Sequence, residues 1–375
     1  MAIDYRPALR DRSGVGEYVY QLARALVAVG ASGAAPARVE LTLFSSSWKD
    51  RLVVGADLDG AALVDRRIPV RLLNAAWHRL EWPPIETLAG GPFDVVHSPT
   101  PLLLPSRRAA RVVTIHDLYF LDHPDQTAAE VRRDYPALTK RHAHRADRII
   151  VPSRATAAHV ARRLGVDAAR ISICAHGRPP WQPRAAAPGD GYLLFVGTLE
   201  PRKNIGGLLD AYERLIAGAP GVPPLLLAGR PTAAARGWLD RIGRPPLAGA
   251  VRHIGYVDPG RRREIYEGAR LLVLPSFDEG FGLPALEAMT IGVPVVAADR
   301  GALPEVVGDA GLLVDPESPD AIASAIRRLL DDGGEAAACA SKGIRRSLQF
   351  DWAATARGVL DAYRRAIEHR RCASA

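Results

Sequence analysis

Short apolar runs alternate with helical patterns along nearly the whole chain, and this alternation restricts the possible folds more than any other feature. It is typical of βαβ units, in which parallel strands form a sheet with helices on both faces. We expect strands at 2–4, 39–44, 95–97, 112–115, 148–151 and 171–173, and then at 192–196, 224–228, 251–254, 271–274, 294–297 and 311–314. Helices are expected between most of them, including 17–29, 155–164, 205–217 and 320–330.

A segment dense in proline and glycine interrupts this pattern near the middle of the chain. It begins Gly-Arg-Pro-Pro-Trp-Gln-Pro at position 177 and ends Pro-Gly-Asp-Gly at position 191, which disfavours regular structure and marks a linker. We therefore predict two doubly wound α/β domains, 1–180 and 191–352, joined by a linker at 181–190. Such folds bind ligands at the carboxyl ends of their strands, so we expect the domains to face each other across a cleft.

Composition agrees with two domains and argues against several other classes. The 375 residues are 48% hydrophobic, enough for two cores of ordinary size. Cys174, Cys339 and Cys372 are far apart and lack CxxC spacing, so we expect neither a disulfide framework nor a zinc site, and a reducing compartment fits best. No secretory signal is visible, and no apolar run approaches the ~20 residues of a spanning helix. A cytoplasmic protein is expected.

The net charge of +8 has two interpretations. Arginine can simply be the solvated residue of an Ala- and Arg-rich chain, or the excess can attract phosphates, an anionic membrane leaflet or nucleic acid. A helix between positions 131 and 148 would carry a cationic face suited to a membrane surface. Interleaved aromatic residues and nucleic-acid signatures are absent. The basic residues of this stretch are Arg132, Arg133, Lys140, Arg141, Arg145 and Arg148.

The stretch from 271 to 289 carries the most chemistry. It reads as a buried strand, a glycine loop and a helix, with Pro284 at the first helical position, where its missing N–H costs nothing. Gly280 and Gly282 let the backbone approach a ligand closely. Because a helix N-terminus presents free N–H groups and the positive end of its dipole, the loop is predicted to bind an anion such as a diphosphate.

Two glutamates flank this loop, Glu279 within it and Glu287 in what we expect to be the first helical turn. Carboxylates repel phosphate, so they are better suited to accept hydrogen bonds from sugar or ribose hydroxyls on either side of it. A structural role is the alternative: Glu279 would cap the loop, and Glu287 would be a first-turn acid favoured by the helix dipole.

Two cations follow another strand of the same domain. That strand ends at Gly197, and Arg202 and Lys203 lie in the loop before a helix that begins near Asn204. Arg can bind a diphosphate by forked hydrogen bonds and Lys as a point charge. They could also be ordinary surface charges, but cations at a helix N-terminus are unfavourable without a compensating anion, which favours phosphate binding.

A glycine turn follows the first strand of the other domain. Ser13-Gly14-Val15-Gly16 opens a helix, but position 19 is Val where a dinucleotide fingerprint has its third glycine. We interpret the turn as a close-approach loop that lines the cleft. No Walker loop occurs in the sequence.

Histidines stand at two strand ends of this domain. His116 and Asp117 directly follow the strand at 112–115, which makes a functional and a structural role equally plausible for His116. His97 has a similar place and is interpreted as structural. Ser153 is expected to N-cap the helix that follows it.

Together these residues resemble the retaining glycosyltransferases of family GT4, which have the GT-B fold. Glu279 and Glu287 match the family's E-x7-E motif. The Arg-Lys segment at 197–204, the glycine loop at 13–16, the strand end at 114–118 and a Gly-x-x-Pro-Glu element at 301–305 occur in the family's order. The resemblance therefore covers nearly the whole chain, although the first strand is short for this family.

The resemblance implies a GT-B fold, with an acceptor-side N-terminal domain, a donor-binding C-terminal domain and a final helix in 353–375 that crosses back to the first domain. Arg202 and Lys203 would hold the diphosphate of a nucleotide-sugar donor, Glu279 the sugar and Glu287 the ribose. His116 would contact the transferred sugar. The full set implied is His116, Glu279, Arg202 and Lys203 for catalysis, and Gly14, Gly16, Gly197, Arg202, Lys203, Glu279, Gly280, Phe281, Gly282, Leu283 and Glu287 for donor binding, with Glu305 as support.

The expected mechanism follows from the duties of these residues. Glu279 and Glu287 are committed to hydroxyls, so the double displacement of retaining glycosidases is disfavoured. We expect front-face transfer, in which the leaving diphosphate helps to deprotonate the acceptor hydroxyl while two cations and the helix N-terminus stabilise its charge. No metal or further cofactor is expected, and no DxD motif stands at a plausible strand end.

Donor and acceptor are expectations of the overall similarity. It leans towards GDP-mannose enzymes of polysaccharide assembly, with UDP-glucose as an alternative and a saccharide or lipid-linked acceptor at the inner face of the membrane. Two rival functions stay open: a GT-B sugar-nucleotide epimerase, and a basic nucleic-acid-binding ligand sensor. The second is disfavoured because acids that line a cleft repel a phosphate backbone.

Overall fold

The computed structural model describes residues 1–9, 12, 14–32, 39–127, 129–218 and 220–374, which form two compact units. Unit 1 comprises Met1–Gly177 and Asp351–Ala375, and unit 2 comprises Arg178–Phe350. The segment 181–190, expected as a linker, lies within unit 2. Trp181 packs against the core of that unit, and the Arg184 N–H donates to the Ile291 carbonyl at 3.0 Å.

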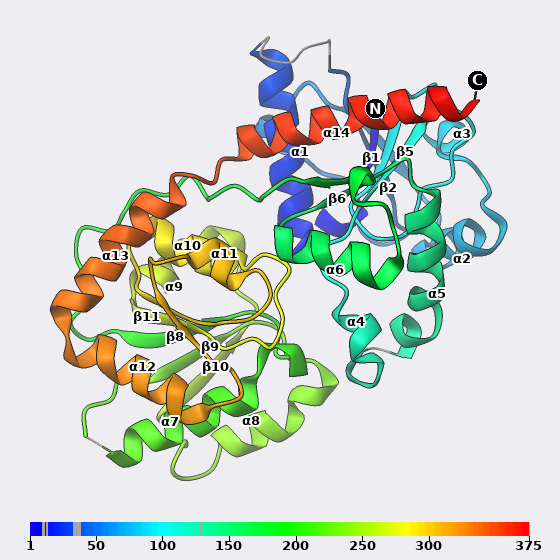
Figure 1. Cartoon of the computed structure of the whole chain (residues 1–375). Helices are drawn as coiled ribbons and strands as arrows, with labels where there is room; N and C mark the ends of the chain where they lie inside the picture. Colours follow the sequence, from blue (N-terminus) through cyan, green and yellow to red (C-terminus); the bar gives the residue numbers. More distant parts are fainter. Residues whose placement is uncertain (10–11, 13, 33–38, 128, 219, 375) are drawn as a thin grey trace. The chain divides into compact units, whose positions relative to one another are not determined.

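Unit 1 is built on a fully parallel sheet of seven strands in the order β3-β2-β1-β4-β5-β6-β7 (Figure 1). The edge strand β3 was not expected from the sequence, because its apolar run is short, ending at Val64, and none of its side chains is buried. The strands are β1 Ala2–Asp4, β2 Thr42–Ser46, β3 Ala62–Arg66, β4 Val95–Ser98, β5 Ala110–Thr114, β6 Arg148–Val151 and β7 Ile171–Ile173.

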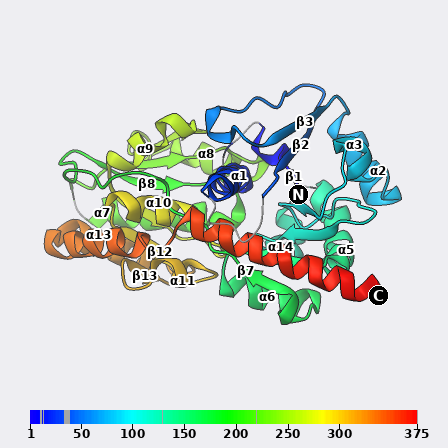
Figure 2. The ribbon, with the colours of Figure 1, turned by 90° about the horizontal axis from the view of Figure 1, so that it is seen from above.

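The last helix of the chain packs on unit 1. Tyr18 and Leu22 on the first helix, α1, share a buried cluster with Val359 and Tyr363 on the last, α14. Figures 1 and 2 both show the two helices in contact beside the sheet. The helices of this unit are α1 Val15–Ala31, α2 Val70–Leu80, α3 Ile85–Ala89, α4 Tyr119–Asp122, α5 Ala129–Arg145, α6 Arg154–Leu164 and α14 Trp352–Ser374.

Unit 2 repeats the doubly wound plan with six parallel strands in the order β10-β9-β8-β11-β12-β13. The predicted architecture of two doubly wound parallel sheets is thus confirmed. The strands are β8 Tyr192–Val196, β9 Leu225–Ala228, β10 Val251–Gly255, β11 Ala269–Leu274, β12 Val295–Ala298 and β13 Leu312–Val314.

Helices cover both faces of this second sheet, and its strands other than the edge strand β10 are therefore almost continuously apolar, as in β11, where five of six residues are buried. The helices are α7 Ile205–Gly218, α8 Arg236–Ile242, α9 Pro259–Glu267, α10 Leu283–Ile291, α11 Leu303–Val307, α12 Pro319–Asp331 and α13 Gly333–Ser347. Within the described ranges, no helix of either unit is both long and apolar enough to span a bilayer.

The strand order reverses at one place in each sheet, between β1 and β4 in unit 1 and between β8 and β11 in unit 2. The loops that leave neighbouring strands at such a point run to opposite faces of the sheet, which opens a crevice at the carboxyl edge. In unit 2, the loops after β8 and β11 carry most of the residues singled out in the sequence.

Candidate active site

A buried ion pair joins the two loops at the switch point of unit 2. Lys203, in the turn Pro201–Lys203 after β8, places its Nζ 2.5 Å from Oε1 of Glu279, in the loop after β11. Only 8% of Lys203 and 6% of Glu279 is exposed to solvent. The Ser276 hydroxyl donates to the same Oε1 at 2.9 Å. The sequence therefore identified two residues that meet in space although they lie far apart along the chain.

Arg202 contacts two carboxylates, those of Glu200 and Glu279. Its Nη2 donates to Glu200 Oε1 at 2.9 Å, and its Nη1 lies 3.1 Å from the Asp278 carbonyl and 3.4 Å from Glu279 Oε2. Glu200 and Glu279 therefore compensate the two cations. The helix dipole therefore does not by itself require a bound anion here, and phosphate binding by these two cations stays a prediction.

The charge of Glu279 is fixed by its neighbours. Burial alone would raise the pKa of this carboxyl, but Lys203 and Arg202 outweigh burial, and together with the Ser276 hydroxyl they hold the pKa below its usual value. Glu279 is therefore ionised at neutral pH and can only accept hydrogen bonds. This state suits the recognition of hydroxyl groups.

The glycine loop has the backbone form that the sequence predicted. Gly280 and Gly282 are buried, and Gly282 adopts φ +100° at the N-cap of α10, so its place requires glycine. The Phe281 ring is turned into the core against Phe350, with ring centroids 5.7 Å apart, so only its backbone can serve a ligand. Leu283 is the first residue of the helix.

Glu287 lies in the second turn of α10 and not in the first, because the helix begins at Leu283. Its Oε1 accepts from Arg262 Nη1 at 3.0 Å, and its Oε2 accepts from the buried Tyr266 hydroxyl at 2.7 Å. A first-turn interaction with the helix dipole is thus excluded as its role. The carboxylate is thus anchored to two residues of α9.

Two residues that hold the Glu279 loop were not recognised as such in the sequence. Asn204, at φ +54°, donates from Nδ2 to the Pro275 carbonyl at 3.1 Å and so ties the end of the first loop to the start of the second. Gly301, at φ +59°, packs so closely that a Cβ there would lie 2.6 Å from the Glu279 carbonyl oxygen. The next residue, Ala302, donates its N–H to that oxygen at 2.8 Å. An asparagine before a helix and a glycine in a Gly-x-x-Pro-Glu element were the available signals.

Gly197 and Glu305 take peripheral places. The Gly197 N–H donates to the Ala228 carbonyl at 2.9 Å, which closes the end of β8 onto β9. Glu305 lies in α11, and its carbonyl accepts from Arg346 at 2.7 Å. In the Gly-x-x-Pro-Glu element at 301–305, the backbone of Gly301 and Ala302 contacts the Glu279 loop.

In unit 1, the glycine turn and His116 lie at the carboxyl edge of the sheet. Gly14 is the N-cap of α1 at φ +52°, and Gly16 is buried in the first turn of that helix, while Ser13 lies outside the described residues. His116 follows β5 and donates from Nε2 to the Pro99 carbonyl at 3.2 Å, because a carbonyl can only accept. Its ring stands edge-on to Tyr18, with centroids 4.8 Å apart.

Burial keeps the His116 imidazole neutral. It lowers the pKa of His116 to about 4, although the Asp117 carboxylate acts in the opposite direction. Asp117 itself accepts the Tyr119 N–H at 3.2 Å and so helps to start α4. With its proton on Nε2, the ring carries a lone pair on Nδ1 and is a weak base.

Two further expectations in unit 1 are confirmed. His97 is fully buried in β4 and bonds the Tyr363 hydroxyl at 2.7 Å and Thr114 Oγ1 at 2.8 Å, a structural role. Ser153 N-caps α6 by accepting the Thr156 N–H, as predicted.

The prediction of a cationic helix between positions 131 and 148 is only partly correct. α5 exposes Arg132, Arg133, Lys140 and Arg141, as expected of a cationic face. Arg148 belongs to β6 and is buried, with hydrogen bonds to Ser172 Oγ and the Ala169 carbonyl, both at 2.7 Å. Its aliphatic stem and its fixed partners place it in the sheet and not on the helix.

Two family profiles together match most of the chain. One, described as "Glycosyltransferase Family 4", matches residues 12–180, and the other, "Glycosyl transferases group 1", matches residues 190–332. The O-antigen chain mannosyltransferase B of Escherichia coli is 34% identical over 287 residues, which cover 72% of this chain and 74% of that protein. The chain belongs to the family 4 glycosyltransferases. It is thus an enzyme of the glycosyltransferase class, EC 2.4.

Other relatives of this glycosyltransferase differ in their named activity. The D-inositol 3-phosphate glycosyltransferase 2 of Catenulispora acidiphila is 29% identical over 97% of this chain and 92% of that protein. The sucrose-phosphate synthase of Thermosynechococcus elongatus superposes with a TM-score of 0.74 at 23% identity, over 97% of this chain and 98% of that one. This structural match supports the GT-B fold of the glycosyltransferase. The relatives do not fix the sugar.

Proposed function

We propose that this chain is a retaining hexosyltransferase that moves mannose from GDP-mannose to a saccharide or lipid-linked acceptor in polysaccharide assembly. The observation that carries the proposal is the meeting of Lys203, Arg202 and Glu279 at the switch point of unit 2. Parallel α/β sheets bind nucleotides at the switch point. In unit 2, the switch point brings two cations, which would bind a diphosphate, next to a carboxylate, which would bind a sugar.

The donor diphosphate would bind Lys203 and Arg202 in front of the α10 N-terminus. Glu279 is the one hydrogen-bond acceptor of the Lys203 ammonium within the described part of the chain, which leaves two of its three N–H groups for phosphate oxygens. The contact of Arg202 with Glu279 is long, at 3.4 Å, and a bidentate phosphate contact is a stronger use of that guanidinium. The dipole of the nine-residue α10 adds to their attraction.

Sugar and ribose would occupy the two sides of the diphosphate. Glu279 and the backbone of the glycine loop would accept and donate hydrogen bonds to the sugar hydroxyls, and Glu287 would accept from the ribose. Glu287 already binds Arg262 and Tyr266, so its orientation is fixed before the donor arrives. Gly14, Gly16 and Gly197 would let the backbone approach the donor.

Transfer would take place on one face of the sugar. The bond from the anomeric carbon to the β-phosphate oxygen breaks, and a bond from the acceptor oxygen to the same carbon forms on the side of the leaving group. The acceptor proton passes to the diphosphate, whose negative charge Lys203 and Arg202 stabilise. His116, neutral at pH 7, would orient the transferred sugar by hydrogen bonding and would not act as a general base.

Mannose is favoured because the mannosyltransferase relative is 34% identical over most of this chain. An inositol phosphate acceptor is the second candidate, since a relative of that name matches 97% of the chain at lower identity. The cationic face of α5 supports a third element of the proposal, peripheral contact with an anionic membrane that would carry a lipid-linked acceptor.

A panel of nucleotide sugars tests the donor. The purified enzyme is incubated with each donor, with and without saccharide acceptors and D-inositol 3-phosphate, and released nucleotide and products are measured. We expect GDP release from GDP-mannose and a glycosylated saccharide. Turnover of UDP-glucose alone would overturn the mannose assignment, and isomerised donor formed without any acceptor would support an epimerase instead.

A further inference from the structure

A small cationic cavity lies in unit 1, lined in part by residues 103–107 of the loop after β4. Its volume is about 220 Å³, and it opens between the end of α2 and the C-terminal half of α5. The cavity is below the ~300–1,000 Å³ of typical small-molecule pockets, so it suits a group of the size of a phosphate and not a whole nucleotide sugar. Its walls are Trp77, Glu81, Trp82, Pro84, Leu103, Leu104, Pro105, Ser106, Arg107, Arg111, His142 and Arg145.

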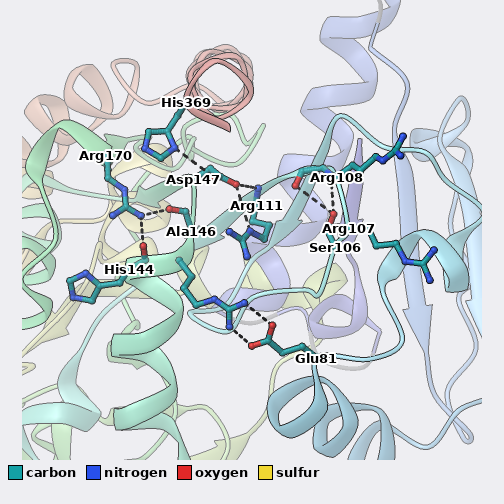
Figure 3. Close-up of polar contacts among 12 residues, drawn as sticks. Glu81, Ser106, Arg107, Arg108, Arg111, His144, Ala146, Asp147, Arg170 and His369 are labelled. Carbon is teal, nitrogen blue, oxygen red and sulfur yellow. Dashed lines mark hydrogen bonds and ion pairs between the residues drawn. The ribbon is translucent and has the colours of Figure 1, made fainter. Parts of the chain in front are cut away.

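Arg111 is the least exposed guanidinium in this wall. Its side chain is 16% exposed, and its Nε lies 3.7 Å from Asp147 Oδ2, beyond hydrogen-bond distance. That oxygen instead accepts the Arg111 N–H at 2.7 Å, and Nε has no hydrogen-bond partner among the described residues. Figure 3 shows Arg111 between Asp147 on one side and Glu81 on the other. A largely buried guanidinium whose Nε lacks a hydrogen-bond acceptor favours a bound anion.

Two further groups supply donors to the same space. His142 Nδ1 accepts the Leu103 N–H at 3.0 Å, so the proton of the neutral ring is on Nε2. Burial lowers the pKa of His142 to about 4 and keeps this form at neutral pH. Arg145 is paired with Glu81, with Nη2 2.6 Å from Oε2. The residues that line the cavity thus include three arginines, Arg107, Arg111 and Arg145, and one carboxylate, that of Glu81.

The rim is apolar and exposed, which indicates where the phosphate would come from. Leu80 and Trp82, at the end of α2, are 73% and 63% exposed, and Arg79 beside them is exposed too. Tryptophan favours the level of lipid headgroups, because its ring is apolar and its N–H can stay hydrated. Beside them, Arg141 on α5 donates to the His78 carbonyl at 3.0 Å, so the basic end of α5 lies against α2.

We propose that this cavity binds the phosphate group of a membrane lipid, with Arg111, Arg145 and the Nε2–H of His142 as donors and with Leu80 and Trp82 in the headgroup layer. The proposal rests on the membrane contact suggested above but not on the identity of the sugar. General charge attraction alone would give a membrane contact without specificity. The proposal adds a specific site for a lipid headgroup.

Vesicle binding separates a site from general attraction. The full chain is sedimented with phosphatidylcholine vesicles that contain or lack phosphatidylglycerol, at low and at raised salt. Arg145→Gln and Arg111→Gln are compared with Arg141→Gln, which removes the same charge one turn away on α5, outside the cavity. Raised salt screens exposed charges over a few ångströms but acts less on buried contacts. Thermal unfolding of each variant shows whether it is folded at the assay temperature.

We expect Arg145→Gln and Arg111→Gln to lose at least about tenfold in affinity for anionic vesicles, the effect of a charge-assisted hydrogen bond. Arg141→Gln should lose at most about fivefold at low salt and nothing at raised salt. Glu81→Gln, which frees Arg145, should bind more tightly. Trp82→Ser should weaken binding, whereas Trp48→Ser, equally exposed but outside the cavity, should not.

Three results would overturn the proposal, and each would support a different alternative. Equal losses in Arg145→Gln and Arg141→Gln at both salt concentrations would leave only general charge attraction. Saturable binding of free glycerol 1-phosphate, as tight as to vesicles and insensitive to Trp82→Ser, would assign the cavity to a soluble phosphate ester. No preference of the wild type for anionic vesicles would remove the membrane contact as well, while turnover of the soluble donor would still report the transferase.

Discussion

The Lys203 ammonium lies 2.5 Å from Glu279 Oε1, and this buried contact ties the loop after β8 to the loop after β11. The same two groups are the proposed partners of the donor diphosphate and the donor sugar. Substitution of either therefore has two effects, one on the stability of the fold and one on catalysis, and the two must be measured separately.

Lys203→Ala and Arg202→Ala should each lower kcat by at least about 100-fold, because each removes a preorganised donor to the developing charge on the leaving group. Lys203→Ala should also lower the free energy of unfolding, by about 3 kcal/mol or more, since it leaves Glu279 buried with a weaker partner. Steady-state kinetics and denaturant unfolding measure the two effects.

A matched double variant separates stability from catalysis. Lys203→Met/Glu279→Gln removes both charges, so it should recover much of the stability that Lys203→Ala loses while turnover stays low. Arg214→Ala, which breaks an exposed ion pair of α7 with Asp320, is the control and should leave kcat unchanged. Turnover near the wild-type level in Lys203→Ala would place the phosphate site elsewhere.

Gly301→Ala should impair activity without contacting the donor. At φ +59°, an added Cβ would lie 2.6 Å from the Glu279 carbonyl oxygen and 2.7 Å from its nitrogen, so the loop must shift. A shift of this size in the sugar-binding loop should lower kcat by at least about tenfold. Gly333→Ala is the control, because a Cβ there meets nothing within 4 Å. Wild-type kinetics in Gly301→Ala would show that this contact does not position Glu279.

The enzyme should stay active in excess EDTA, because Lys203, Arg202 and the α10 N-terminus would neutralise the leaving diphosphate. Within the described ranges, no group of three or more His, Cys, Asp or Glu side chains could hold a metal ion. The measurement is the initial rate of transfer with chelator and after addition of magnesium or manganese. Loss of activity in EDTA and recovery with either metal would contradict this charge assignment.

Acid should destabilise unit 1, because its buried histidines are neutral in the folded state. Burial lowers the pKa of His97 to about 3 and that of His116 to about 4. Between these values and the ordinary pKa of ~6.5, the unfolded chain binds protons that the folded chain does not. The free energy of unfolding therefore decreases as the pH is lowered through this range. Each histidine contributes up to about 1.4 kcal/mol per pH unit in that window. His97→Asn should reduce the slope of unfolding free energy against pH, and an unchanged slope would contradict the neutral state of His97.

The convergence of the site could be predicted from the sequence because it follows from topology. In a doubly wound sheet, residues that follow different strands meet at one edge, and this brought Arg202, Lys203 and Glu279 together correctly. The strands were recognisable where both faces are buried, since their sequence is then almost all apolar. The edge strand β3, Ala62–Arg66, was missed because its apolar run is short and ends at Val64, before Asp65 and Arg66.

The partners of each charge could not be predicted, because they depend on how the loops fold against one another. Nothing in the local sequence shows that Glu287 would be held by Arg262 and Tyr266 from α9. The close approach of Gly301 to Glu279 is likewise a tertiary contact. Local rules describe caps and turns, whereas compensation of buried charge is decided by packing.

The configuration of the first-formed product tests the central claim most directly. If the acceptor enters on the leaving-group side beside Glu279 and Lys203, an α-linked donor must give an α-linked product. An inverting enzyme would instead need a base on the opposite face, and the neutral His116, with a pKa of about 4, is a poor one. His116→Ala should therefore slow transfer without changing the anomer. Proton NMR of the product at early times should show the α-anomeric signal, and a β-anomeric signal would contradict both the mechanism and the role given to His116.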